Sequence, residues 1–139
     1  MKGMADLNYE QALDYIHSHK RFGSKLGLER IGELMRLLGN PQEKLRFVHV
    51  AGTNGKGSTS IMTAAILRAA GYRTGLTVSP FVVDFCERVQ IDGSVISHEE
   101  LSEEITRIQP FADQVEGLTE FELITAAAFD LFHRKNCEI

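Results

Sequence analysis

A glycine-rich turn with a single lysine constrains the fold of this chain more than any other feature of its sequence. Residues 52–58 read Gly-Thr-Asn-Gly-Lys-Gly-Ser, between an apolar run at 46–51 and an alanine-rich segment at 58–70. The apolar run has the β-branched and aromatic residues typical of a strand, whereas the second segment has helical apolar spacing and is followed by Gly71. The sequence therefore predicts a strand, a glycine turn and a helix, in that order.

Such a turn is typical of a phosphate-binding site. Free backbone N–H groups and the positive end of the helix dipole attract a phosphate, and Lys56 adds a mobile charge suited to the β- and γ-phosphates of ATP. The usual P-loop pattern, however, has a glycine where this chain has Val50 and a hydroxyl where it has Gly57. The nearest hydroxyls, Ser58 and Thr59, are displaced. A tight turn that is rich in glycine for steric reasons alone is the alternative.

Length and composition exclude several classes of protein. The 139 residues suffice for one domain, and a second complete domain would not fit. A net charge of −4 provides no basic field for nucleic acid, and no stretch is apolar enough for a signal peptide or a membrane span. Cys86 and Cys137 lie in unrelated contexts, as in a reducing compartment. We expect a cytoplasmic protein without nucleic-acid or membrane partners.

The remaining patterns predict alternating helices and strands. Helical periodicity, supported in three cases by a capping-box spacing, predicts helices at 9–19, 28–38, 97–110 and 119–133. Extended patterns predict a strand at 74–79, a hairpin at 88–96 that turns at Asp92-Gly93, and a turn into a new strand at 136–139. Strands separated by helices pair in parallel. The expected fold is an α/β, P-loop-type, three-layer domain with a mainly parallel sheet flanked by helices and incomplete at its C-terminal end.

Eight separated segments carry a resemblance to a known family. They are Tyr15-Ile16-His17-Ser18, Arg21-Phe22-Gly23, Gly27-Leu28-Glu29-Arg30-Ile31, Gly39-Asn40-Pro41, His49-Val50-Ala51 joined to the glycine turn, Ser79-Pro80-Phe81, Glu87-Arg88-Val89 and Leu118-Thr119-Glu120-Phe121-Glu122. In order and spacing they resemble the N-terminal part of the folylpolyglutamate synthase and dihydrofolate synthase family, a branch of the Mur-type amide ligases.

The resemblance implies an ATP-dependent ligase that joins L-glutamate to the carboxylate of a folate or of dihydropteroate through an acyl phosphate. Charge on the transferred phosphate would be neutralised by backbone N–H groups, a lysine and Mg²⁺. Lys56 would be the catalytic residue that stabilises this charge. The residues implied to hold the nucleotide phosphates are Thr53, Asn54, Gly55, Lys56, Gly57 and Ser58.

The resemblance also implies ligands for Mg²⁺ and a substrate contact. Ser79 and Glu122 would be the magnesium ligands, and Phe81 in the mobile loop 80–88 would contact the pterin ring. Each has an alternative: Ser79 as an ordinary serine before proline, Glu122 as the capping partner of Thr119, and Phe81 as loop packing. The nearby charges of Arg88, Glu87 and Asp84 are expected to pair on a solvated face.

Members of such a family are roughly two to three times as long, with a second domain that contributes to the glutamate and adenine site. We therefore assign residues 1–139 to the N-terminal part of a Mur-ligase-type ATP-binding domain without the C-terminal glutamate-ligase domain, and we expect no turnover from the chain alone. A generic P-loop NTPase or kinase is one alternative. Another is a non-enzymatic nucleotide-binding or interaction module, whose unfinished sheet edge near Ile139 would self-associate or pair with another chain.

Overall fold

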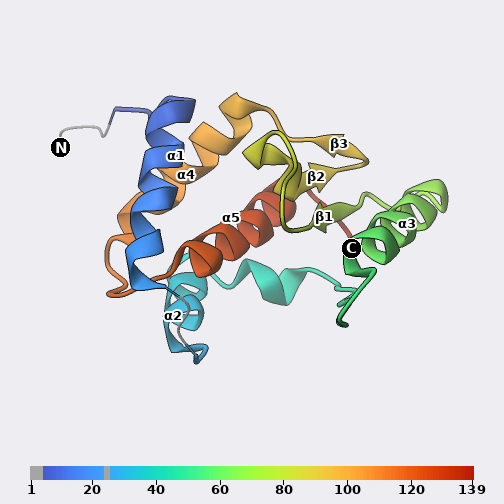
Figure 1. The fold of residues 1–139 in the computed structure, drawn as a ribbon, viewed down its shortest axis with the longest axis horizontal. Coiled ribbons are helices and arrows are strands. Elements are labelled where there is room, and N and C mark those ends of the chain that lie inside the picture. The colour runs from blue at the N-terminus through green and yellow to red at the C-terminus, as the bar shows by residue number, and fades with distance from the viewer. Residues whose placement is uncertain (1–4, 24–25) are drawn as a thin grey trace. The chain divides into compact units, whose positions relative to one another are not determined.

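The computed structural model describes residues 5–23 and 26–139, whose helices and strands are drawn in Figure 1. The chain divides into two compact units. The first unit comprises Met1–Asn40 and Ser97–Phe129, and the second comprises Pro41–Ile96 and Asp130–Ile139. Residues 1–4 lie outside the described residues. They belong to the N-terminal segment, for which the sequence predicts no signal peptide. One boundary between the units falls within the helix at Glu120–Arg134.

The first unit is helical, as predicted. Its elements are α1 (Tyr9–Ser18), the 3₁₀ turn η1 (His19–Phe22), α2 (Glu29–Leu37), α4 (His98–Ala112) and the first part of α5 (Glu120–Arg134). The predicted capping boxes of Asn8 with Gln11 and of Ser97 with Glu100 are both formed, because each side chain bonds the backbone N–H of the other. Pro110 does not end α4, which continues to Ala112.

The apolar stripes of these helices meet in a buried core. Its members include Ile16 of α1, Leu34 of α2, and Leu101, Ile105, Ile108 and Leu123 of α4 and α5. On α5, Ile124, Ala128 and Leu131 are buried as predicted, but Phe121 is 69% exposed and Thr125 is half-buried. The prediction was wrong for these two residues. Phe121 and Thr125 are four positions apart and therefore lie on the same face of the helix, and α5 turns this face outward.

The second unit carries the sheet. Its elements are η2 (Pro41–Lys44), α3 (Lys56–Ala69), β1 (Gly75–Thr77), η3 (Phe85–Arg88), β2 (Val89–Ile91), β3 (Ser94–Val95) and the last residues of α5. The strands pair in the order β1-β2-β3, with Leu76 opposite Gln90 and Gln90 opposite Val95. The predicted hairpin is confirmed, since Asp92 and Gly93 both adopt the left-handed conformation that its two-residue turn requires.

The prediction of a strand at 46–51 was wrong for this structure. The segment has no regular structure, and Phe47 and Val48 are 51% and 56% exposed. A strand forms only where a neighbouring strand satisfies its N–H and C=O groups, and the sheet of the described residues, β1-β2-β3, does not include this segment. The fold is α/β, but its assigned sheet is antiparallel, and the expected mainly parallel sheet is not seen.

The chain turns after α5, as the sequence predicts. Asn136 is left-handed, and Cys137 N donates to Phe132 O at 2.9 Å, which closes the helix end. The last residues then lie beside β1: Glu138 N donates to Arg73 O at 2.7 Å and Gly75 N to Ile139 O at 2.9 Å. The two segments therefore run in the same direction, although the contact is too short to be assigned as a strand pair.

Among the described residues, every helix is too short or too polar to span a membrane.

Candidate functional site: the turn before α3 and the α5 cap

The glycine turn leads directly into α3, as predicted, although the helix begins at Lys56, two residues early. Gly55 is its N-cap residue, with φ 75°. A Cβ built at Gly55 would meet no atom within 4 Å, so the backbone conformation rather than space requires glycine here. No side chain caps this helix, and its first turn contains no acidic residue. The N-terminal N–H groups of α3 are thus left for another partner.

Lys56 folds back over the turn. Its Nζ donates to Gly52 O at 2.7 Å and lies 3.3 Å from Thr53 O. Residues 51–56 are all exposed, so a positive charge and the free N–H groups lie together at the surface of the second unit. This combination favours an anion at the start of α3.

Ser79 lies two residues beyond β1 in the same unit. It is exposed, and its hydroxyl makes no hydrogen bond to the described residues. The backbone beside it is fixed, because Val78 N donates to Arg88 O at 3.1 Å and closes the base of the loop 80–88. An available hydroxyl oxygen fits Mg²⁺, which prefers hard oxygen ligands.

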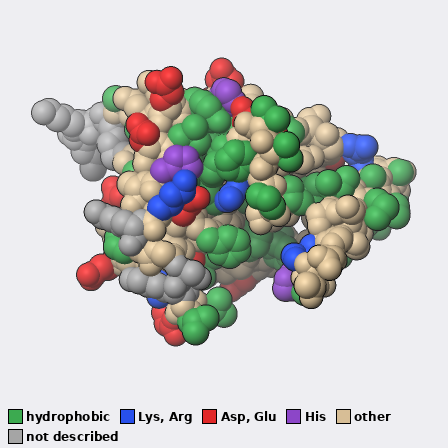
Figure 2. Space-filling view, in the orientation of Figure 1, with side chains coloured by type: hydrophobic (Ala, Val, Ile, Leu, Met, Phe, Trp, Pro, Cys, Tyr) green, Lys and Arg blue, Asp and Glu red, His purple; other side chains and the backbone are tan. Residues whose placement is uncertain are grey.

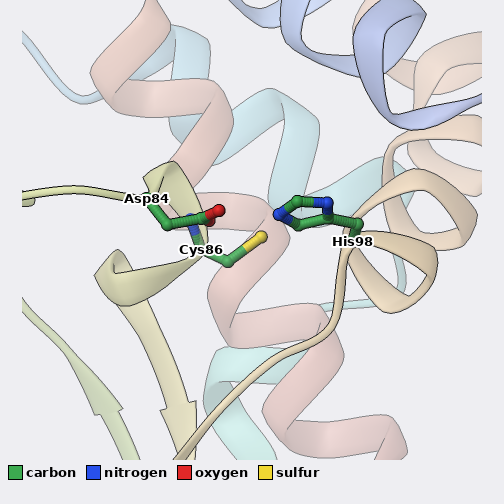
Figure 3. Close-up of side chains that lie close together, drawn as sticks. All are labelled: Asp84, Cys86 and His98. Atoms are coloured by element: carbon green, nitrogen blue, oxygen red, sulfur yellow. The ribbon is translucent and has the colours of Figure 1, made fainter.

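The loop 80–88 is organised around Glu87. Its carboxylate accepts the backbone N–H groups of Val82 at 2.8 Å, Val83 at 3.0 Å and Asp84 at 2.8 Å. Hydrogen bonds from Val82, Asp84 and Val83 lower the pKa of this carboxyl. Asp84 in turn accepts Cys86 N at 2.8 Å; both side chains are drawn at the start of η3 in Figure 3. The acidic residues of this loop therefore hold its backbone.

The expected pairing of Arg88 with Glu87 or Asp84 is not formed. Arg88 instead lies over two aromatic rings, with its Cζ 5.6 Å from the centre of the Phe81 ring and 5.1 Å from that of Phe85. The two rings are 5.5 Å apart. Phe81 is 38% exposed, so it packs the loop while part of its ring remains accessible. Its contact with a substrate ring stays a prediction.

Glu122 belongs to the first unit and caps α5. Its Oε2 accepts Thr119 N and Thr119 Oγ1, both at 2.9 Å, and Glu122 N donates to Thr119 Oγ1 at 3.2 Å. Arg30 approaches from α2, with Nε 3.1 Å from Oε2 and Nη2 3.0 Å from Oε1, the latter as an ion pair rather than a directed hydrogen bond. The carboxylate is thus shared by a helix end and a guanidinium.

Electrostatics favour the charged form of Glu122. Burial alone would raise the pKa of this carboxyl, since only 6% of the residue is exposed, but hydrogen bonds from Arg30 and Thr119 outweigh it and lower the pKa. These contacts match the capping alternative. As a magnesium ligand, Glu122 would exchange its contact with Arg30 for the ion. A metal role for Glu122 stays a prediction.

Arg30 is the residue that sequence reasoning missed at this site. The segment Gly27-Leu28-Glu29-Arg30-Ile31 was recognised only as part of the family resemblance. A signal was nevertheless present, because a carboxylate at the N-terminus of an apolar helix is often buried, and a buried carboxylate needs a cation. The sequence could not identify which of the 15 lysines and arginines supplies it.

Known proteins resemble this chain over most of its length, although no family model matches it. A dihydrofolate synthase/folylpolyglutamate synthase of Bacillus subtilis is 41% identical over 129 residues, which cover 89% of this chain and 30% of that protein. A solved folylpolyglutamate synthetase from Lactobacillus casei superimposes with a TM-score of 0.88 at 36% identity, covering 95% of this chain and 35% of that one. A third similar protein is an FPGS–AMPPCP–folate complex, with a TM-score of 0.86 at 35% identity, covering 95% of this chain and 34% of that one.

The chain thus spans about a third of the length of the relatives that it matches, and the similarity extends over nearly all of its own residues. The sequence identity of 36–41% agrees with the close superposition of the backbones. The chain belongs to the folylpolyglutamate synthase and dihydrofolate synthase family, as a match to the N-terminal portion of its members.

Proposed function

We propose that this chain is the ATP-binding N-terminal portion of a ligase that joins L-glutamate to the carboxylate of a folate or of dihydropteroate through an acyl phosphate. Similar proteins described as an FPGS–AMPPCP–folate complex and as dihydrofolate synthase/folylpolyglutamate synthase support these substrates. The structural observation that carries the proposal is the N-terminus of α3.

That helix end differs from the others in its charge. Among the five α-helices of the described residues, α1, α2, α4 and α5 each have an acidic residue in the first turn, whereas α3 has none and begins with Lys56. A cation at this end opposes the helix dipole and costs stability. A bound phosphate would be attracted both by the helix dipole and by the charge of Lys56, so this helix end is suited to a nucleotide.

The residues of the turn take complementary roles in this proposal. The backbone N–H groups of Lys56, Gly57 and Ser58 point out of the helix start and would bind phosphate oxygens, with Thr53 and Asn54 lining the approach. Lys56 would exchange its bonds to Gly52 O and Thr53 O for phosphate oxygens and stabilise the charge that develops during transfer.

Magnesium would be held at Ser79, whose hydroxyl is available, together with phosphate oxygens and water, which is the usual coordination of Mg²⁺ beside a nucleotide. When bound, the ion supplies charge neutralisation on the transferred phosphate. Phe81 would contact the substrate ring through its exposed edge. No step of this proposal depends on Glu122.

Residues 1–139 form the first part of an ATP-binding domain in this proposal. Turnover would require a completed parallel sheet and a glutamate-ligase domain, which correspond to the part of the longer relatives that this chain does not match. A reducing cytoplasm is supported by Cys86 and Cys137, which are both buried and form no disulfide within the described residues. We propose no nucleic-acid or membrane partner.

Calorimetric titration of the chain with MgATP tests the phosphate site. Lys56→Ala is expected to weaken binding at least about tenfold without lowering the unfolding midpoint, because Lys56 is exposed and its charge opposes the helix dipole. Lys44→Ala is the matched control, since Lys44 is another exposed lysine of the same unit, and it should change neither quantity. Equal loss in both variants, or a folded wild-type chain that binds no MgATP, would refute the site. ATP turnover without folate and glutamate would favour a generic NTPase instead.

A further inference from the structure

The guanidinium of Arg88 has an uncommon environment in the second unit. Arg88 is half-buried and lies over the rings of Phe81 and Phe85, with its Cζ 5.6 Å and 5.1 Å from their centres. Its Nε is buried and has no hydrogen-bond partner among the described residues. Basic side chains beside hydrophobic ones are visible at the molecular surface in Figure 2. Arg88 is thus supported by aromatic rings rather than by an acid.

The acids nearest to Arg88 in the sequence are occupied by the backbone of the loop 80–88. Glu87 accepts the backbone N–H groups of residues 82–84. Asp84 accepts Cys86 N at 2.8 Å. No ion pair joins Arg88 to a carboxylate of the described residues. Aromatic rings attract a cation but accept none of its directed N–H bonds and leave its charge in place, so this guanidinium is suited to an incoming anion.

The backbone holds Arg88 beside Ser79. Val78 N donates to Arg88 O at 3.1 Å, and this bond continues the pairing of β1 with β2. Ser79, the proposed magnesium ligand, is the next residue along the chain. Phe81 follows two residues later and is 38% exposed, so part of its ring is accessible. A cation without a counterion and an aromatic surface therefore lie together next to Ser79.

We propose that Arg88 binds the carboxylate of a pteroate-type acceptor, an aromatic ring that bears a carboxylate, while the exposed edge of Phe81 contacts the ring. The inference rests on the proposed function, which supplies this substrate. A planar guanidinium can hold one carboxylate oxygen while the other forms a bond to the γ-phosphorus and the bond from that phosphorus to ADP breaks. Arg88 thus positions the group that the ligase activates.

The phosphates of the nucleotide are the other anion that could reach Arg88. They already have Lys56 and the N–H groups at the start of α3, where no side chain caps the helix. The rings under the guanidinium also match the aromatic part of the acceptor, whereas a triphosphate has no apolar part to place on them. The carboxylate is therefore the anion that this environment favours.

Calorimetric titration with a charged and a neutral ligand tests the proposal. Pteroate, the stable oxidised form of dihydropteroate, carries the carboxylate, and its methyl ester keeps the rings without the charge. The wild-type chain is expected to bind pteroate at least about tenfold more tightly than the ester. Arg88→Met should weaken pteroate binding at least about tenfold and change ester binding by less than about twofold, because only the charged ligand uses the guanidinium. Arg88→Lys keeps the charge without the planar fork and should retain part of the preference.

Arg46→Met is the matched control. Arg46 lies over the Tyr72 ring of the same unit, with its Cζ 5.7 Å from the ring centre, so this variant also removes an arginine from an aromatic ring. It should leave both affinities unchanged. Thermal unfolding of each variant reports on stability separately. A purely structural role of Arg88 would weaken the binding of both ligands equally, and that result would overturn the proposal.

Two further outcomes would also contradict the role of Arg88. One is a folded wild-type chain that binds pteroate no better than the ester. The other is a loss of MgATP affinity in Arg88→Met with pteroate binding retained, which would assign the guanidinium to a phosphate. Titration of the wild type with MgATP separates this inference from the proposed function. If MgATP binds and pteroate is not preferred, only the assignment of Arg88 fails, whereas absence of MgATP binding counts against the nucleotide site itself.

Discussion

The N-termini of α5 and α3 solve the same physical problem in opposite ways. Both helices expose N–H groups that lack a partner within the helix. At α5, Thr119 and Glu122 satisfy them inside the protein, and Arg30 balances the charge of the carboxylate. At α3, Gly55 offers no side chain, no acidic residue follows, and Lys56 adds a positive charge.

The difference lies in how completely each helix end is satisfied within the protein. The α5 end is electrostatically complete and buried, so an added ion would have to break existing bonds. The α3 end is incomplete and exposed, and an anion would improve it without breaking a buried contact. The same criterion favours a capping role over a metal role for Glu122, and it supports the phosphate site at Lys56.

The strongest test of this contrast removes the cation at the α5 cap. Arg30→Met should lower the free energy of unfolding by roughly 3 kcal/mol, because it leaves the Glu122 carboxylate buried and unpaired. Urea unfolding followed by circular dichroism measures the change. Arg36→Met is the control, since Arg36 pairs with the exposed Glu33 and should cost less than about 1 kcal/mol. Equal effects would show that the α5 pair is no more important than a surface one.

A smaller effect is expected at the carboxylate itself. Glu122→Gln retains an oxygen for Thr119 and should cost about 1–2 kcal/mol at neutral pH. The folded state lowers the pKa of Glu122, so its stabilisation is present above the ordinary value of 4.5 and is lost as the pH falls below it. The variant should therefore lose less stability than the wild type between pH 6 and pH 3, measured by urea unfolding at each pH.

Titration of the same Glu122→Gln variant with MgATP distinguishes the two roles of this residue. A capping residue leaves the affinity unchanged once the protein is folded. Loss of affinity at unchanged stability would instead restore Glu122 as a magnesium ligand and break the comparison between the two helix ends.

The smallest expected effect on stability comes from giving α3 the acid that it lacks. Ser58→Asp places a carboxylate in its first turn and should raise the free energy of unfolding by about 0.5 kcal/mol, while MgATP binding is lost through competition and repulsion. Ser58→Asn, nearly identical in shape but neutral, should keep most of the binding. If the acid leaves MgATP affinity intact, the phosphates do not bind at this helix end.

Local structure was predictable where the cause lies within a few residues. The capping boxes of α1 and α4, the hairpin turn at Asp92-Gly93, and the left-handed Gly71 after α3 all follow from short-range hydrogen bonds and backbone preferences. The glycine turn was placed correctly for the same reason. The predicted burial of Phe121 was wrong because periodicity gives the spacing of the residues on one helix face but not the direction in which that face points.

The sequence by itself determined that this chain forms helices, a hairpin and a phosphate-type turn, because those features depend on neighbouring residues. Only the tertiary structure decided that Glu122 is held by Arg30, that Phe81 packs under Arg88, and that the apolar run at 46–51 has no regular structure. These outcomes depend on groups far apart in the sequence. Ion pairs, ring contacts and strands require a partner in space, and a sequence pattern records the need for a partner but not its identity.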